Sequence, residues 1–183
     1  MIQRMIRAAR LDKMVFREVA ADPKEMTQAI IVILLVALAT GIGEGSAGIF
    51  SRDFGQGVVG LISGIISVFV SWVLWSYVTY AVGKYAFEVE TTPGAVMRAI
   101  AFAQSPAVLN ILGGLPFLGR WIAVVVLIWS LVASFIATRE VLRLDDTRTL
   151  IAVVTGFIVV LMIAALLYAV FGPSASLFGA LSG

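Results

Sequence analysis

Long apolar runs alternate with short polar segments along most of the chain, and this alternation predicts its secondary structure. Each run is long enough to cross the apolar core of a bilayer as a helix, which takes about 20 residues. Glycine, proline or charged residues stand between the runs and break the pattern. The sequence therefore predicts five transmembrane helices, at about residues 23–43, 57–83, 94–112, 121–138 and 150–171.

Composition assigns these helices to a membrane protein. Apolar residues make up 61% of the chain and charged residues 13%, against about 45 to 50% and about 25% in soluble domains. We therefore expect an all-α integral membrane protein, a bundle of five transmembrane helices forming one domain over residues 23–171. The small, uncharged residues 172–183 are expected to form a poorly ordered extracytoplasmic tail.

The first 22 residues are polar enough to lie outside the bilayer, and they predict a short amphipathic helix. Its apolar face would carry five residues: Ile2, Met5, Ala9, Phe16 and Val19. On one interpretation, this helix lies in the membrane interface and contacts anionic lipid or a partner. On the other, it is a solvated helix that folds back on the protein's own cytoplasmic face.

Small side chains recur at spacings of three and four on three of the predicted helices. Such stripes let neighbouring helices approach closely when lipid removes the hydrophobic drive between them. We therefore expect helix packing at twelve positions: Gly57, Gly60, Gly64, Ser67, Ser71, Ala95, Ala99, Ala103, Ala107, Ser130, Ser134 and Thr138.

Between and beside these stripes, local composition predicts further features. The glycine-rich segment from Glu44 to Gln56 predicts a flexible loop. Trp75 belongs to an aromatic group typical of a membrane interface. Arg98 lies one turn inside the third helix, and we expect its side chain to snorkel to the surface.

The third helix should bend at Gln104, Ser105 and Pro106. Pro106 cannot donate a hydrogen bond to the carbonyl of Phe102, and Gln104 or Ser105 can satisfy that carbonyl instead. A structural kink is one interpretation. A broken helix that carries a transport site is the other.

Basic residues predict the orientation of the bundle. With the N-terminus in the cytoplasm, eleven of the thirteen Lys and Arg residues fall on cytoplasmic segments, and only Arg52 and Arg120 fall on the opposite side. Positive charge is enriched in cytoplasmic loops. We therefore expect a cytoplasmic N-terminus, an external C-terminus and a location in the inner (plasma) membrane.

Candidate chemistry is sparse. The chain has no Cys and no His, which excludes thiolate chemistry, imidazole catalysis and the usual zinc and haem ligands. No Asp, Glu, Lys or His falls in the middle of a predicted span. We therefore expect no enzyme, no cofactor and no metal, and the net charge of +2 does not suggest binding to nucleic acid.

A family resemblance appears around the third and fourth helices. Thr92-Pro93-Gly94, the run from Ala101 to Pro106, the Gly113 to Arg120 turn and the charged Arg139 to Arg148 connection resemble the Yip1 domain family in its prokaryotic form. The resemblance implies a five-span membrane protein. In eukaryotic relatives it implies binding to Rab-type GTPases and a role in shaping or trafficking membranes. The Asp-Leu-Tyr-Gly-Pro-like motif of those relatives is not found in this sequence.

Two hypotheses for function follow. The first is a non-catalytic membrane scaffold or accessory subunit that contacts membrane lipid and other membrane proteins or a second copy of itself. Its contact residues would be Arg4, Arg7, Arg10, Lys13, Arg17, Arg139, Arg143 and Arg148. The alternative is a small-solute or ion transporter or channel that uses the Pro106 kink and five serine hydroxyls, those of Ser63, Ser67, Ser71, Ser130 and Ser134.

Overall fold

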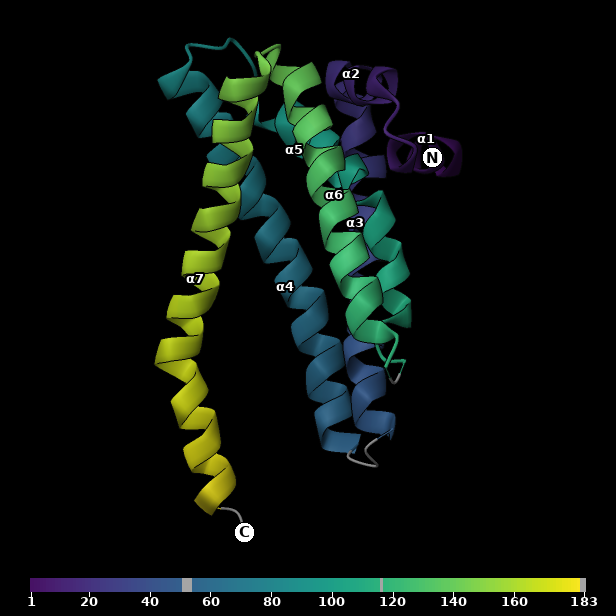
Figure 1. Cartoon of the computed structure of the whole chain (residues 1–183), viewed down its shortest axis with the longest axis vertical. Helices are drawn as coiled ribbons and strands as arrows, with labels where there is room; N and C mark the ends of the chain where they lie inside the picture. Colours follow the sequence, from purple (N-terminus) through teal and green to yellow (C-terminus); the bar gives the residue numbers. More distant parts are fainter. Residues whose placement is uncertain (51–53, 116, 182–183) are drawn as a thin grey trace.

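The computed structural model describes residues 1–50, 54–115 and 117–181. Its regular elements in these ranges are all helical, and they form an elongated bundle (Figure 1). In chain order they are α1 (Ile2–Ala9), α2 (Lys13–Ala21), the short η1 (Pro23–Glu25), α3 (Met26–Phe50), α4 (Phe54–Ala81), the π-helical turn η2 (Val82–Ala86), α5 (Pro93–Ala103), the 3-10 helix η3 (Ser105–Leu112), α6 (Gly119–Leu142) and α7 (Asp146–Leu181).

Four helices are long and apolar enough to cross a membrane. They cover Pro23–Ser46, Gly57–Ala86, Gly119–Leu142 and Asp146–Ile163. The pair formed by α5 and η3 adds a fifth crossing if it is counted as one span, although it is bent by 42°. The described chain is thus an all-helical membrane protein with four to five candidate spans.

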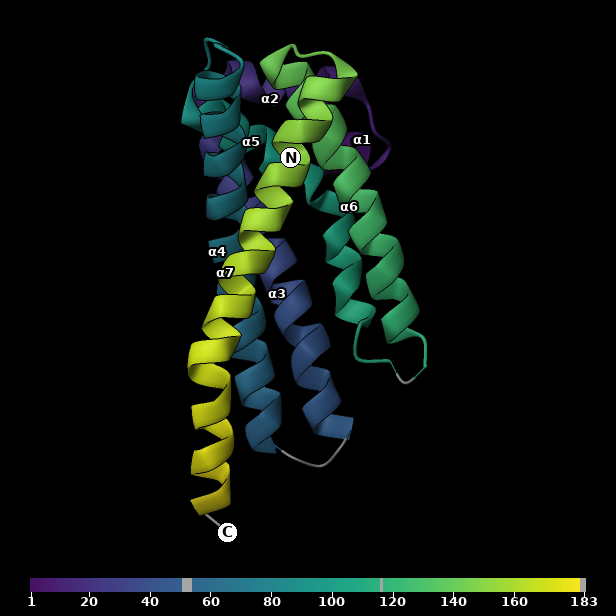
Figure 2. The same ribbon diagram turned by 60° about the vertical axis from the view of Figure 1, so that its left-hand side comes forward.

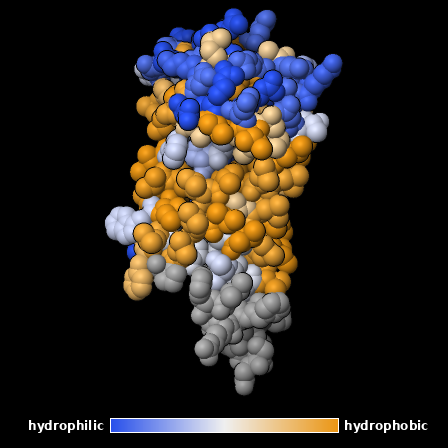
Figure 3. All heavy atoms as spheres, turned by 90° about the vertical axis from the view of Figure 1, so that its right-hand side faces the viewer, coloured by the Kyte–Doolittle hydropathy of each residue, from blue (hydrophilic) through white to orange (hydrophobic). Residues whose placement is uncertain are grey.

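Polar and apolar surfaces separate along the length of the bundle. One end, here called the polar end, carries α1, α2, the segment 87–92 and the connection 143–145. Figure 3 shows hydrophilic side chains gathered at this end, above a belt of hydrophobic ones. The opposite end, here called the far end, contains residues 113–115 and 117–118 and the last turns of α3. This separation is the surface expected of a bundle embedded in lipid.

Helices α3 and α7 extend furthest beyond their predicted boundaries. Helix α3 continues to Phe50 rather than ending at residue 43, so Glu44 lies in a helix and not in a flexible loop. Only residues 51–53 of that predicted loop remain, and they lie outside the described ranges. Helix α7 runs from Asp146 to Leu181, past the predicted end at residue 171 and into the expected tail.

Glycines explain why the glycine-rich end of α3 stays helical. A Cβ atom added at Gly45 would lie 2.8 Å from the carbonyl oxygen of Gly57, and one at Gly64 would lie 2.7 Å from the Cα of Gly41. Real Cβ atoms do not come so close, and only glycine permits this approach of α3 to α4. The same glycines that locally suggest a loop therefore stabilise a helix pair (Figure 2).

Helix α5 forms the centre of the polar half of the bundle. It contacts α2, α3, α4 and α6, and both Ile100 and Phe102 are almost fully buried. Helix α7 is the most peripheral span. It packs through its first half, where Gly156 lies directly against the indole of Trp75 on α4, and it then exposes Leu161 and Met162.

Candidate functional site

The N-terminal residues form two helices that dock on the polar end of the bundle. The chain turns at Leu11, where φ is +62°, and Asp12 caps α2 by accepting a hydrogen bond from the backbone N–H of Met14 at 2.9 Å. Helix α2 packs on α5 and α6 and buries Phe16 and Val19 completely. The geometry of α2 is therefore that of a segment folded back on its own protein.

Arg98 holds the end of α2 in place. Its Nε donates to the carbonyl of Val19 at 2.8 Å, and its terminal nitrogen donates to the carbonyl of Ala20. These carbonyls belong to the last turn of α2, where no intrahelical donor is available and where positive charge is favourable. The expectation that Arg98 snorkels to the surface is wrong, because the residue is only 5% exposed.

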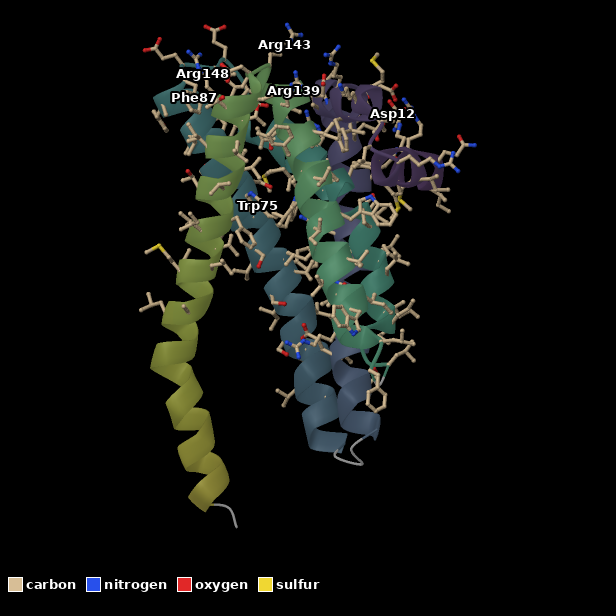
Figure 4. All side chains as sticks on the ribbon, in the orientation of Figure 1. Asp12, Trp75, Phe87, Arg139, Arg143 and Arg148 are labelled. Atoms are coloured by element: carbon tan, nitrogen blue, oxygen red, sulfur yellow. The ribbon has the colours of Figure 1, made fainter. Side chains whose placement is uncertain are left out.

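Most of the predicted lipid or partner contacts are engaged in ion pairs within the protein. Five of the eight pair with carboxylates: Arg4 with Glu25 (2.6 Å), Arg7 with Asp12 (2.7 Å) and Glu18 (2.9 Å), Arg17 with Glu140 (2.6 Å), Arg139 with Asp146 (3.0 Å) and Arg148 with Asp145 (3.3 Å). Within the described part of the chain, Arg10, Lys13 and Arg143 make no ion pair, and all three are exposed. Figure 4 shows Arg139, Arg143 and Arg148 together at the polar end.

The Arg7 pairs join α1 to α2 electrostatically. The hydrogen bond from the Arg7 guanidinium holds the pKa of Glu18 below its usual value, and the same guanidinium, together with the N–H of Met14, lowers the pKa of Asp12. The two carboxylates in turn raise the pKa of Arg7. The relative position of α1 and α2 therefore depends on groups that titrate only in acid.

The predicted small-residue stripes divide between packing and cavity. Gly57 and Gly64 are buried against α3, whereas Ser67 and Ser71 at the other end of that stripe line a cavity. Gly60 on the same stripe is half-buried. On the remaining stripes Ala95 is half-buried, and the buried members are Ala99, Ala103, Ala107, Ser130, Ser134 and Thr138.

The third predicted span bends where Pro106 interrupts it. Ser105 Oγ donates to the carbonyl of Phe102 at 2.6 Å and so occupies the position that the missing N–H of Pro106 leaves. Beyond this point the chain continues as η3, in a 3-10 helix. Gln104, at the bend itself, is half-buried and lines the cavity described next.

A half-open cavity, here called the fissure, separates the bent hairpin from α3 and α4 in the far half of the bundle. Its larger part has a volume of about 590 Å³ and lies between α3, η3 and α6. Polar lining comes from Thr40, Glu44, Trp75, Gln104, Asn110, Arg120 and Ser130. A smaller part of about 290 Å³ continues between α3, α4 and α7 and shares Trp75 and Gln104.

Two of these lining residues differ from their predicted positions. Trp75 does not present its indole to lipid as a member of an interfacial belt would, since it is 8% exposed and packs inside the bundle, against Gly156 on α7 (Figure 4). Glu44 lies inside α3, six residues before its end at Phe50, because α3 is longer than predicted. Gly41 and Gly45 flank Glu44 at a spacing of four and pack on α4, and this spacing is the sequence signal that could have revealed the helix.

Within residues 1–50, 54–115 and 117–181, no group of three or more Asp and Glu residues is placed to hold a metal ion. The arrangement instead offers an exposed cationic surface at one end and a polar fissure toward the other.

Comparison with protein families identifies the architecture. The model of the Yip1 domain matches residues 12–169 of the chain. The protein belongs to the Yip1 domain family. Within this Yip1 domain lie α2, α3, α4, the bent α5–η3 pair, α6 and the part of α7 up to residue 169, whereas α1 precedes it. Comparison with curated proteins and with solved structures finds no match.

Membership makes this chain a multi-span membrane protein of the Yip1 type. Its apolar helices place it in contact with lipid. The Yip1 assignment lends no support to the alternative of a transporter built on the Pro106 kink.

Proposed function

We propose that this Yip1 domain protein is a non-catalytic membrane scaffold whose polar end faces the cytoplasm and contacts lipid and a neighbouring membrane protein. The observation that carries the proposal is the surface of α1. Ile2 and Ile6 are 67% and 49% exposed, and Arg10 follows them at the same spacing of four. On a helix this spacing places the two apolar side chains and the cation on one stripe. Such a stripe fits the boundary between acyl chains and anionic headgroups, where apolar side chains enter the bilayer and the cation meets the headgroups.

Packing beneath α1 also supports a position of this helix at the membrane boundary. Trp129 on α6 donates its indole N–H to the carbonyl of Ala9 at 2.8 Å, which holds the end of α1 against the bundle. An apolar groove of about 450 Å³ remains between α1 and the outer faces of α3 and η3, lined by Ile6, Leu38 and Val108 among others. A groove of this composition suits an acyl chain of the adjacent leaflet.

Charge at the polar end supports a cytoplasmic location in a plasma membrane. Most of the basic side chains are there, and ion pairs occupy many of them. Arg10, Lys13 and Arg143 are left to attract anionic lipid or an acidic partner surface. Each basic residue near a cytoplasmic leaflet contributes about 1 kcal/mol of attraction.

Orientation is testable because the chain has no cysteine. We expect a cysteine introduced at Lys13 to react with an impermeant maleimide only after the membrane is permeabilised. A cysteine introduced at Phe117, which is 95% exposed at the far end, should react in intact cells. The reverse labelling pattern would overturn the proposed topology.

Scaffold function is tested by what the solubilised protein retains. We expect the wild-type chain to hold anionic phospholipid and a membrane-protein partner that mass spectrometry identifies. Replacing Arg10, Lys13 and Arg143 together by Gln should release both. The matched control replaces Arg139 and Arg148, whose charges are already paired. A wild-type monomer with no partner, no lipid preference and no effect on membrane shape would refute the proposal.

A further inference from the structure

Two opposite charges line the fissure without neutralising one another. Glu44 comes from α3 and Arg120 from α6, and no ion pair joins these two described side chains. The Glu44 carboxylate lies over Gly64 on α4, where an added Cβ would be 2.9 Å from its Oε2. The fissure therefore presents an anionic and a cationic group to the same space.

Depth in the membrane narrows the class of ligand. Arg120 is the second residue of the span Gly119–Leu142, so its side chain lies where an apolar span gives way to the headgroup region of a bilayer. Glu44 is six residues before the end of α3 at Phe50 and lines the same fissure. A ligand that reaches both groups is at the level of phospholipid headgroups in the leaflet at the far end.

The inner part of the fissure requires polar contents as well. Trp75 Nε1 and Ser130 Oγ are buried and have no hydrogen-bond partner within the described part of the chain, and the two residues are 8% and 6% exposed. Both line the fissure, next to Gln104. An acyl chain in this space would leave buried donors unsatisfied, which is unfavourable. Water that enters with a polar ligand can satisfy them.

Electrostatic complementarity selects a zwitterion. A purely anionic ligand would face the carboxylate of Glu44, and a purely cationic one would face Arg120. A primary ammonium offers three N–H donors to a carboxylate, and a guanidinium fork matches a phosphate. An ethanolamine phosphate group carries both charges within one small headgroup, and the volume of about 590 Å³ accommodates it together with several waters.

We propose that the fissure binds the zwitterionic headgroup of an ethanolamine phospholipid, with its ammonium on Glu44 and its phosphate on Arg120. The tails remain in the bilayer beside η3 and α6, and water fills the inner part of the fissure around Trp75 and Ser130. This site is at the opposite end of the protein from the cationic surface on which the scaffold proposal rests, so each can fail without the other.

Native mass spectrometry of the delipidated full-length protein in detergent tests the site. The probes are dioleoyl phosphatidylethanolamine, its trimethylated phosphatidylcholine analogue, anionic phosphatidylglycerol and water-soluble phosphoethanolamine. The binding that depends on the fissure is the part that Ala123→Phe removes, which leaves out lipid held by the cationic surface at the polar end. We expect this part to be roughly tenfold tighter for the ethanolamine lipid than for either other lipid, a difference of about 1.4 kcal/mol. If phosphoethanolamine displaces the ethanolamine lipid, the ligand of the fissure is the soluble form of the same zwitterion. If it does not displace the lipid, the ligand is the lipid itself.

Four variants separate this site from nonspecific lipid binding. Glu44→Gln and Arg120→Gln should each weaken binding of the ethanolamine lipid about tenfold, and Ala123→Phe should block the fissure while leaving every charge in place. Glu90→Gln, on an exposed connection at the polar end, is the matched control and should bind as wild type does. Phosphatidylglycerol that binds the fissure as tightly as the ethanolamine lipid, measured as the binding that Ala123→Phe removes, would overturn the proposal. So would unchanged ethanolamine-lipid affinity in the three fissure variants.

Discussion

Arg98 gives the sharpest test of how the N-terminal helices are attached. Replacement by Met keeps much of the side-chain volume and removes the charge, the hydrogen bond to Val19 and the hydrogen bond to Ala20. The carbonyls of Val19 and Ala20 then lie beneath the buried methionine side chain and no longer receive hydrogen bonds from it. We expect α2 to detach from the bundle far more often, although Phe16 of α2 remains buried against the other helices.

The magnitude follows from the two hydrogen bonds. Bonds from a charged donor contribute about 1.5 to 3 kcal/mol each. Part of this is offset, because a guanidinium that is 5% exposed no longer has to be desolvated. A net loss of about 3 kcal/mol remains, which corresponds to a roughly hundredfold larger detached population.

Hydrogen exchange measured by mass spectrometry on the protein in nanodiscs reports this population. We expect exchange of the α2 amides to accelerate by roughly the same factor, while α4 exchanges as before. Arg139→Met is the matched control, since its pair with Asp146 is largely exposed and contributes about 0 to 1 kcal/mol. Unchanged α2 exchange in Arg98→Met would show that Arg98 does not hold this helix.

Three further predictions concern the helix pair, the kink and acid. Gly64→Ala should destabilise the bundle by about 1 to 3 kcal/mol, since its Cβ would force α3 and α4 apart; a thermal unfolding midpoint equal to wild type would contradict this. Ser105→Ala should cost about 1 to 2 kcal/mol by leaving the Phe102 carbonyl unpaired, and Ser105→Thr should restore the midpoint. The Glu18 pair with Arg7 lowers the pKa of Glu18, so its contribution is complete above the usual pKa of about 4.3 and is lost as pH falls further. Spin-label distances between α1 and α2 should therefore broaden only below about pH 4, and a Glu18→Gln variant should lack this dependence.

Much of the architecture is readable from local sequence. Apolar runs long enough to span a bilayer predict the four long helices and the bent pair, because burial in lipid demands an uninterrupted apolar, hydrogen-bonded segment. The break at Pro106 and a side chain able to satisfy Phe102 are also local, since proline removes one specific donor. The concentration of basic residues on alternate connections is likewise visible in the order of residues alone.

Tertiary structure alone decided what the polar and small residues do. Glycines near Glu44 suggest a loop to any local reading, but they pack on another helix and extend α3, which carries Glu44 into the fissure. Arg98 meets carbonyls 78 and 79 residues earlier in the chain, and Arg17 meets Glu140 at a separation of 123. Helix formation depends on neighbours within a few positions, whereas ion pairing, capping and cavities depend on which helices come together. Periodicity therefore determines the spans, and only their packing determines which charges are neutralised and which remain available to a ligand.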